Sequence, residues 1–118
     1  MYTDFTQMPV WQKASEAMKE AYRIASLLPK TENYAMGQQI RDAALSIPGN
    51  IAEGFGRFHV KDKINFYYYS RGSAFEVRNH ALCAVMVGYF SADKIVFLEQ
   101  KCNEVIQDLN KLIRHLGG

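Results

Sequence analysis

The residues best suited to chemistry are basic and aromatic side chains between positions 57 and 78. Five basic and two acidic residues lie there, a local excess of three positive charges. The candidate set comprises Arg57, Lys61, Lys63, Tyr67, Arg71 and Arg78. On a helix the last four would fall within about 80° of one another. Basic groups neutralise phosphates and aromatic rings stack on unpaired bases, so the pattern predicts a surface for RNA or single-stranded DNA.

A second interpretation treats the same residues as a solvated helix face. Its arginines would then pair with Glu53, Glu76 or a neighbouring subunit. A patch this small binds weakly unless an oligomer repeats it. The two interpretations differ in where the side chains point, because a strand can be held only by side chains that reach solvent.

A compact polar cluster surrounds the proline at position 48. It consists of Arg41, Ser46, Pro48, Asn50, Glu53, Gly54 and Arg57. One interpretation is a binding site at a kinked helix, where freed carbonyls meet polar side chains. In the other, Ser46 and Asn50 satisfy backbone groups that Pro48 leaves without partners, and Glu53 pairs with Arg41 or Arg57.

Familiar catalytic and metal-binding patterns are incomplete. The Gly54-Phe-Gly56 element has no preceding strand and no third glycine, so it does not match a phosphate loop. His80 and Cys83 could be two metal ligands, but His59 and His115 lie far off in the sequence and no pair of carboxylates completes the site. Neither Arg71 nor Arg78 has the spacing to His80 found in small helical ribonucleases. We therefore expect a non-enzymatic protein without a metal or cofactor.

Four apolar segments with helical periodicity must position these residues. They run over residues 10–28, from about residue 32 or 34 to residue 55, over residues 60–89, and from a capping serine at position 91 to residue 116. The last carries a stripe of near-heptad spacing. Short breaks separate the segments, which predicts one all-α domain over residues 1–118, an antiparallel up-down-up-down four-helix bundle.

The second segment contains a proline in its interior. Proline removes a backbone donor and clashes with the preceding turn. The apolar stripe nevertheless keeps its phase from Ile40 to Phe55. This favours one helix kinked at Pro48 over two helices. A restart after Asn50 stays open, because Glu53 follows it at the spacing of a capping pair.

The third segment predicts self-association. Its run Ala81–Val87 is apolar without interruption, so it faces every direction around a helix axis. In a four-helix bundle each helix turns one face to solvent, and another copy of the chain would cover that face. The alternative is that small residues in the run tolerate exposure.

Composition bounds the remaining possibilities. The 118-residue chain is 48% hydrophobic and 22% charged, with a net charge of +2. Both cysteines lie in apolar helical patterns and suit a reducing compartment. No stretch reaches the roughly 18 apolar residues of a membrane span. With no signal-peptide pattern at its start, the chain is expected to be cytoplasmic, without a membrane partner.

Several stretches resemble one bacterial family, the four helix bundle proteins or 23S rRNA intervening-sequence proteins. The matching stretches are Val10–Ala14, Gln39–Arg57, Arg71–Ser73 and Gly88–Tyr89. The resemblance implies a four-helix bundle that forms ring-like pentamers, with no established activity for most members. A related branch contains accessory proteins of diversity-generating retroelements, which implies nucleic acid or a nucleic-acid-handling protein as partners.

The chain departs from the family pattern at three positions. Arg78 replaces an acidic residue, Asp42 replaces an arginine, and Gly49 replaces a serine. These changes alter local charge, so a family surface function transfers poorly there. The leading hypothesis is a homo-oligomeric bundle that binds nucleic acid through its basic surface. A protein-interaction scaffold without nucleic-acid binding is the alternative, and an unrecognised enzyme is the third possibility.

Overall fold

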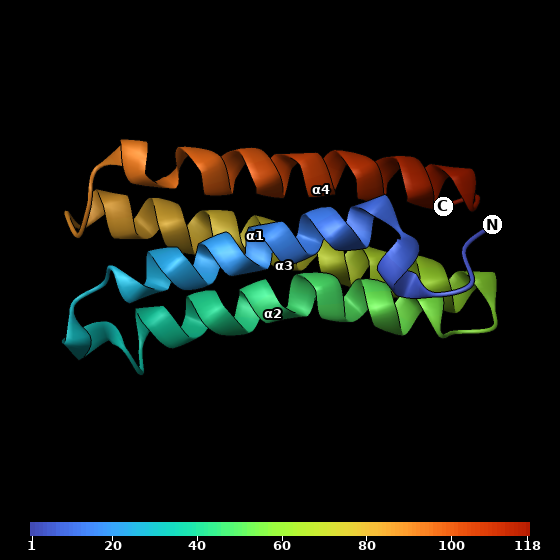
Figure 1. Ribbon diagram of the computed structural model, residues 1–118, viewed down its shortest axis with the longest axis horizontal. Coiled ribbons are helices and arrows are strands. Elements are labelled where there is room, and N and C mark those ends of the chain that lie inside the picture. The colour runs from blue at the N-terminus through green and yellow to red at the C-terminus, as the bar shows by residue number, and fades with distance from the viewer.

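The computed structural model describes all residues 1–118 and contains four α-helices and no strand (Figure 1). The helices are α1 (Pro9–Ser26), α2 (Met36–Phe55), α3 (Val60–Met86) and α4 (Val96–His115). Three short 3-10 helices accompany them: η1 (Phe5–Gln7), η2 (Lys30–Glu32) and η3 (Ala92–Ile95). The predicted all-α class is confirmed. None of the helices is both long and apolar enough to cross a membrane.

The helices form an elongated bundle of 43 × 23 × 21 Å. The main contacts join α1 to α2, α2 to α3, α3 to α4 and α4 to α1, and the α2–α3 contact is the most extensive. Figure 1 shows successive helices running in opposite directions along the long axis. Because α1 and α3 lie diagonally across the bundle, the surface formed by α1 and α2 is opposite the surface formed by α3 and α4.

Helix α1 follows its predicted stripe but ends early. Val10, Ala14, Ala17 and Ala21 are buried at spacings of three and four, as an amphipathic helix requires. The helix stops at Ser26, two residues before the predicted end at Leu28. The following Pro29 disfavours helical geometry at the residue before it, which accounts for the difference.

Helix α2 continues through its internal proline. It runs from Met36 to Phe55 with Pro48 inside, so the prediction of one helix instead of two is confirmed. A bend at Pro48 stays a prediction. The helix starts later than expected, because residues 30–32 form η2 instead, and the Glu32 side chain accepts a hydrogen bond of 3.2 Å from the Met36 amide.

The junction between α3 and α4 differs from the prediction. Helix α3 ends at Met86, and Gly88 follows with a φ of +87°, a left-handed conformation that glycine adopts readily. The Tyr89 amide donates to the Ala84 carbonyl and the Gly88 amide to the Val85 carbonyl, which together close the helix end. Ser91 therefore precedes η3 instead of α4, and its hydroxyl bonds the Asp93 carboxylate.

The core runs the length of the bundle between the four helices. On α4, Leu98, Cys102, Val105 and Leu109 are buried as predicted. The predicted stripe then fails at Leu112 and Leu116, which are only half-buried, while Ile113 is buried. An ideal helix has 3.6 residues per turn, so a strict heptad stripe drifts around it by about 20° per heptad.

Candidate functional site

The basic and aromatic residues predicted to bind nucleic acid have mostly intramolecular partners. Lys63 lies at the end of α2, where its Nζ donates to the carbonyl oxygens of Phe55 at 2.9 Å and Gly54 at 3.3 Å. Both carbonyls belong to the last turn of α2, where the helix itself supplies no further amide donors, although the Arg57 amide also donates to the Gly54 carbonyl. Lys63 therefore caps α2 and does not project from α3 toward a ligand.

Tyr67 is part of the core, so the prediction that it stacks on bases is wrong. Its side chain is 3% exposed, and burial raises the pKa of its hydroxyl above the ordinary value of 10.0. The reason lies on α2, where Gly54 leaves room for the ring. A Cβ added at Gly54 would lie 2.8 Å from Tyr67 Cε1, which is closer than a Cβ approaches a non-bonded atom in proteins.

Arg71 and Arg78 turn toward α4 instead of toward open solvent. Arg71 donates through Nη1 to Asn110 Oδ1 at 2.7 Å, and Arg78 forms an ion pair with Glu99. Both partners lie on α4, so neither Arg71 nor Arg78 pairs with Glu53 or Glu76, and pairing with a neighbouring subunit stays a prediction. The four residues do share one face of α3, but that face packs on the rest of the bundle.

The two remaining members of the basic set lie near the start of α3. Arg57 forms an ion pair of 3.1 Å with Glu53, and its guanidinium lies 4.7 Å from the centre of the Phe66 ring. Lys61 is exposed and forms no ion pair. Between them Phe58 is 89% exposed. Exposed basic and aromatic groups thus gather around the α2–α3 connection.

The polar cluster around Pro48 consists mostly of local contacts. Ser46 donates to the Asp42 carbonyl at 3.0 Å, and Asn50 donates to the Ser46 carbonyl at 2.9 Å. Both bonds reach back four residues along α2, so neither satisfies the carbonyl of Ala44, the one that Pro48 deprives of a donor. Ser46 and Asn50 do bond the helix backbone, as the second interpretation predicted. The carbonyls that they bond are not the one that Pro48 leaves without a donor.

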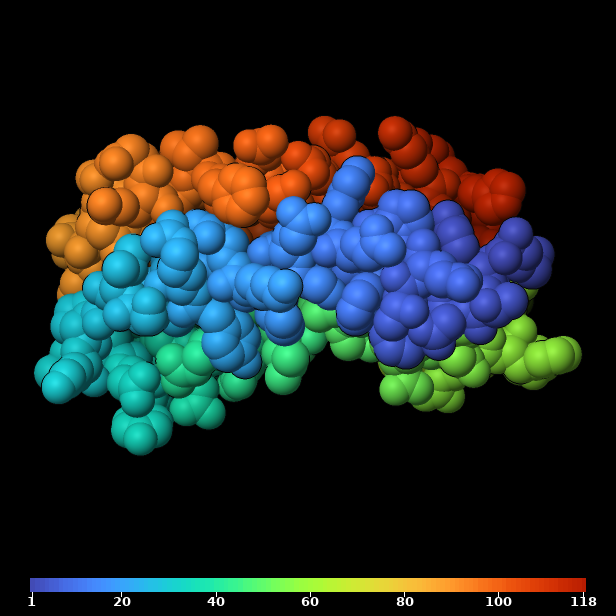
Figure 2. Space-filling model, viewed as in Figure 1, coloured from blue at the N-terminus to red at the C-terminus, as the bar shows by residue number.

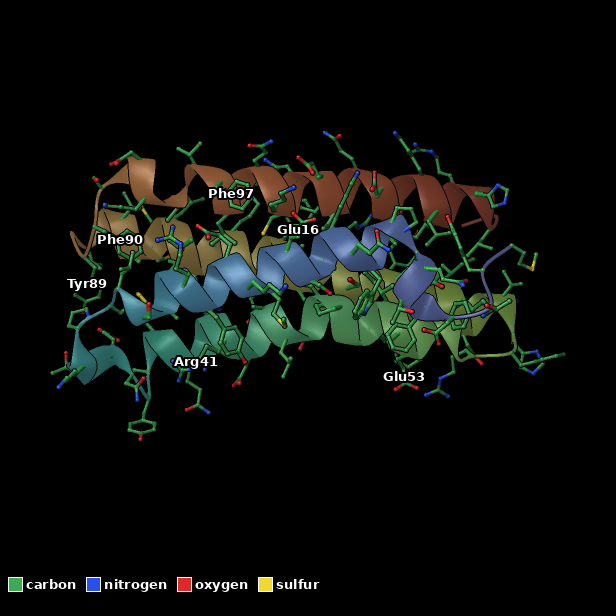
Figure 3. The ribbon with its side chains drawn as sticks, viewed as in Figure 1. Glu16, Arg41, Glu53, Tyr89, Phe90 and Phe97 are labelled. Atoms are coloured by element: carbon green, nitrogen blue, oxygen red, sulfur yellow. The ribbon has the colours of Figure 1, made fainter.

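The charged members of this cluster separate along α2. Figure 3 shows Arg41 and Glu53 near opposite ends of the helix. Arg41 donates to the backbone oxygen of Asn33 at 2.8 Å and so ties the α1–α2 connection to α2. Glu53 pairs with Arg57, which was one of its two predicted partners. The side chains of the polar cluster therefore do not surround one common site.

The outer surface of α3 carries four exposed large apolar residues on the side nearer α4. This α3 stripe consists of Tyr68, Phe75, Leu82 and Met86. Its spacing of seven, seven and four places them above one another on a helix. Phe75 is 48% exposed and Met86 is 75% exposed. The heptad spacing of Tyr68, Phe75 and Leu82 is a signal that the sequence itself carries.

The apolar run Ala81–Val87 divides between core and surface. Ala81 and Ala84 are buried, whereas Leu82, Met86 and Val87 are exposed. The bundle therefore covers only part of the run. Coverage of the other part by a second copy stays a prediction.

A groove lies between α1 and α2, on the opposite side from the α3 stripe. This α1–α2 groove has a volume of about 590 Å³. Its lining residues are Trp11, Gln12, Ser15, Glu16, Met18, Lys19, Leu45, Pro48, Gly49 and Ala52. Figure 2 shows the molecule hollowed on the α2 side of α1. The small residues Ser15, Gly49 and Ala52 account for the depth.

The chain matches a family model over residues 6–111, which is most of its length. The matching model is that of the 23S rRNA-intervening sequence protein. The chain belongs to this family. No match is found among the curated proteins.

The fold of this 23S rRNA-intervening sequence family member also occurs among solved structures. One of them is a crystal structure of a protein of unknown function from the S23 ribosomal protein family of Bacteroides thetaiotaomicron VPI-5482. The two chains are 20% identical, with a TM-score of 0.81 over 88% of this chain and 97% of the other. At this identity the likeness concerns the fold alone. It agrees with the four-helix architecture of the family member described above.

Proposed function

We propose that this protein is a self-assembling subunit of a homo-oligomer, with a structural and non-catalytic role. The observation that carries the proposal is the α3 stripe. It presents large apolar side chains to solvent along the outer surface of the longest helix. Contiguous exposed apolar patches on soluble proteins commonly mark interaction sites.

The surroundings of the stripe also suit an interface. Nine positions of α3 from Asn65 to Met86 are exposed, and Glu76 is the one charged residue among them. The cores of protein interfaces are depleted in charged residues and enriched in aromatic residues and methionine. Heptad spacing is the pattern by which a helix packs along a partner helix.

Size-exclusion chromatography coupled to light scattering tests the proposal. We expect a mass that is a multiple of the subunit mass of 13.5 kDa, and five times that mass for the pentamer implied by the family resemblance. A species of 13.5 kDa at micromolar concentration would overturn the proposal.

A matched pair of variants locates the interface. Phe75 and Phe97 are both 48% exposed, but Phe97 lies on α4 beside Lys101 and outside the stripe. Phe75→Glu should reduce the mass to that of the subunit, because a carboxylate cannot be buried in an apolar contact. Phe97→Glu should leave the oligomer intact, and the carboxylate suits the first turn of α4. Equal effects of the two substitutions would argue against assembly through α3.

We propose nucleic-acid binding as a second candidate function, located at the α2–α3 connection. The observation that favours this location is the exposed Phe58 between Arg57 and Lys61. Lys111 and Arg114 are exposed near the end of α4 and form no ion pair. The end of α4 lies beside the start of α3, since a Cβ on Gly118 would contact Ile64. An oligomer would repeat this set in every subunit, which raises avidity.

Binding of a fluorescent single-stranded RNA or DNA at several salt concentrations tests this second function. The affinity should fall steeply with salt, because bound phosphates release counterions. Phe58→Ala should cost about 1–3 kcal/mol on single strands and much less on duplexes. Phe90→Ala is a control at the other end of the bundle. Absence of salt-dependent binding would favour the scaffold alternative.

A further inference from the structure

We propose that the α3 stripe of one subunit docks into the α1–α2 groove of a second copy of the chain. The inference rests on the proposed self-assembly and specifies which two surfaces meet. It makes the interface heterologous, so that each subunit uses one surface to contact the next and a different surface to contact the previous one.

The positions of the two surfaces allow this arrangement. The α3 stripe lies on the α3–α4 side of the bundle, and the groove lies on the α1–α2 side. Because these sides are opposite, one subunit can be engaged on both at once. Repetition of such a contact generates a closed ring when the rotation between subunits closes, and an open filament when it does not.

The shapes of the two surfaces also match. The stripe is a ridge of large side chains along one helix, whereas the groove has Gly49 and Ala52 in its wall. A Cβ placed on Gly49 would meet no heavy atom within 4 Å, so the groove is open to solvent there. Helices pack when the ridge of one fits the groove between residues of another. Trp11, Met18 and Leu45 supply apolar contacts for the incoming helix.

Each of the two surfaces has charged groups that are not paired within the subunit. A shallow hollow on α2 adjoins the groove and shares Leu45 and Gly49 with it. The charged residues lining the two are Glu16, Lys19, Asp42 and Glu53. Glu16 pairs with Lys101 and Glu53 pairs with Arg57, which leaves Lys19 and Asp42 without an ion pair. The charged residues beside the stripe include Arg71, Glu76, Arg78 and Glu99, and Arg78 pairs with Glu99.

Unpaired charges at the two surfaces allow a polar contact beside the apolar one. Asp42 forms no ion pair within its own subunit, and Arg71 bonds an amide instead of a carboxylate. Both groups therefore have charge left for a partner.

A variant that fills the groove tests the inference first. Gly49→Trp adds a large ring where the subunit itself has free space, so the fold should persist by circular dichroism. We expect the light-scattering mass to fall to 13.5 kDa. Gln39→Trp, at an exposed position of α2 outside both surfaces, should retain the mass of the unmodified protein. An unchanged mass for Gly49→Trp would overturn the inference.

Disulfide trapping separates the inference from the proposed function. One chain carries Phe75→Cys and a longer affinity tag, and a co-expressed chain carries Leu45→Cys. Both chains also carry Cys83→Ser, while Cys102 is kept because it is buried and burial raises its pKa to about 12. On mild oxidation we expect a cross-link between the two different chains and none between identical chains.

The other possible results of the cross-linking experiment can be told apart. Cross-linked pairs of the Phe75→Cys chain with itself would show a two-fold contact of stripes, which overturns the inference and leaves self-assembly standing. An oligomer without any cross-link would place the interface elsewhere and also overturn the inference. A protein that is monomeric before any substitution would overturn both proposals.

Discussion

The hydroxyl of Ser70 on α3 donates a hydrogen bond of 2.7 Å to the carbonyl oxygen of Ile47, the residue before Pro48. Ser70 is the one polar residue among the buried side chains. The bond joins the two helices with the most extensive contact at the point where proline interrupts the hydrogen-bond ladder of α2. The α2–α3 interface thus combines apolar packing with a polar contact beside Pro48.

Replacement of Ser70 by alanine should reduce the free energy of unfolding by about 1 kcal/mol, since a neutral buried hydrogen bond contributes about that much. Ser73→Ala is the matched control, because Ser73 lies one turn further along α3 and its hydroxyl has no bonding partner. Its effect should stay within about 0.5 kcal/mol. Urea denaturation in the Phe75→Glu background measures both without a contribution from assembly. Losses of equal size would contradict a specific role for the Ser70 bond.

Replacement of Pro48 by alanine should leave the free energy of unfolding unchanged or raise it by up to about 1 kcal/mol. Alanine restores the backbone donor toward Ala44 and is the best helix former. The gain is reduced because the buried proline ring loses its apolar contacts. The same urea titration measures the change. A loss greater than about 1 kcal/mol would mean that the core needs the proline ring.

Two glycines of α2 should respond to alanine in opposite directions. Gly54→Ala should reduce the free energy of unfolding by about 1–3 kcal/mol, because its Cβ would meet Tyr67 Cε1 at 2.8 Å and Phe66 Cβ at 3.2 Å. Gly49→Ala should raise it by about 0.5–1 kcal/mol, since its Cβ meets nothing and alanine restricts the unfolded chain. Thermal or urea unfolding of the two variants measures both changes in the free energy of unfolding. A stabilised Gly54→Ala variant would show that the helices can separate without cost.

The helices could be predicted because their signal is local. Apolar residues at spacings of three and four mark each helix in the sequence itself. The end of α3 could not be placed, because it depends on the left-handed conformation of Gly88 and the backbone bonds that this conformation permits. The start of α4 was also misplaced, since Ser91 precedes a 3-10 turn and its hydroxyl bonds the Asp93 side chain instead of a backbone amide of α4.

The candidate site was predicted less well because a helical wheel does not say what lies opposite each face. Periodicity correctly placed Tyr67 and Arg78 on one face of α3. The Arg78–Glu99 pair depends on how α3 packs on α4, which no local pattern reports. Tyr67 is buried because Gly54, on a different helix, leaves space for its ring. The exposed Phe58 belongs to a loop and has no periodicity to mark it.

The α1–α2 and α3–α4 connections are in contact at one end of the bundle. The Tyr89 hydroxyl donates to the Glu32 carboxylate, 57 positions away in the chain. This bond lowers the pKa of Glu32 below its ordinary value of 4.5 and raises the pKa of Tyr89 above 10.0. Figure 3 shows Tyr89 at the end of the bundle where the α1–α2 connection passes. The contact needs an ionised carboxylate and a protonated hydroxyl.

The stabilisation should therefore be present between about pH 4.5 and pH 10. It is lost as the pH falls through the lowered pKa of Glu32, and again as the pH rises through the raised pKa of Tyr89. Tyr89→Phe should lower the melting temperature at pH 7 and have little effect at acidic pH once Glu32 is protonated. Tyr34→Phe is the control, because Tyr34 is exposed and its hydroxyl has no partner. A Tyr89→Phe effect of the same size at every pH would show that ring packing, and not the bond to Glu32, accounts for the stability.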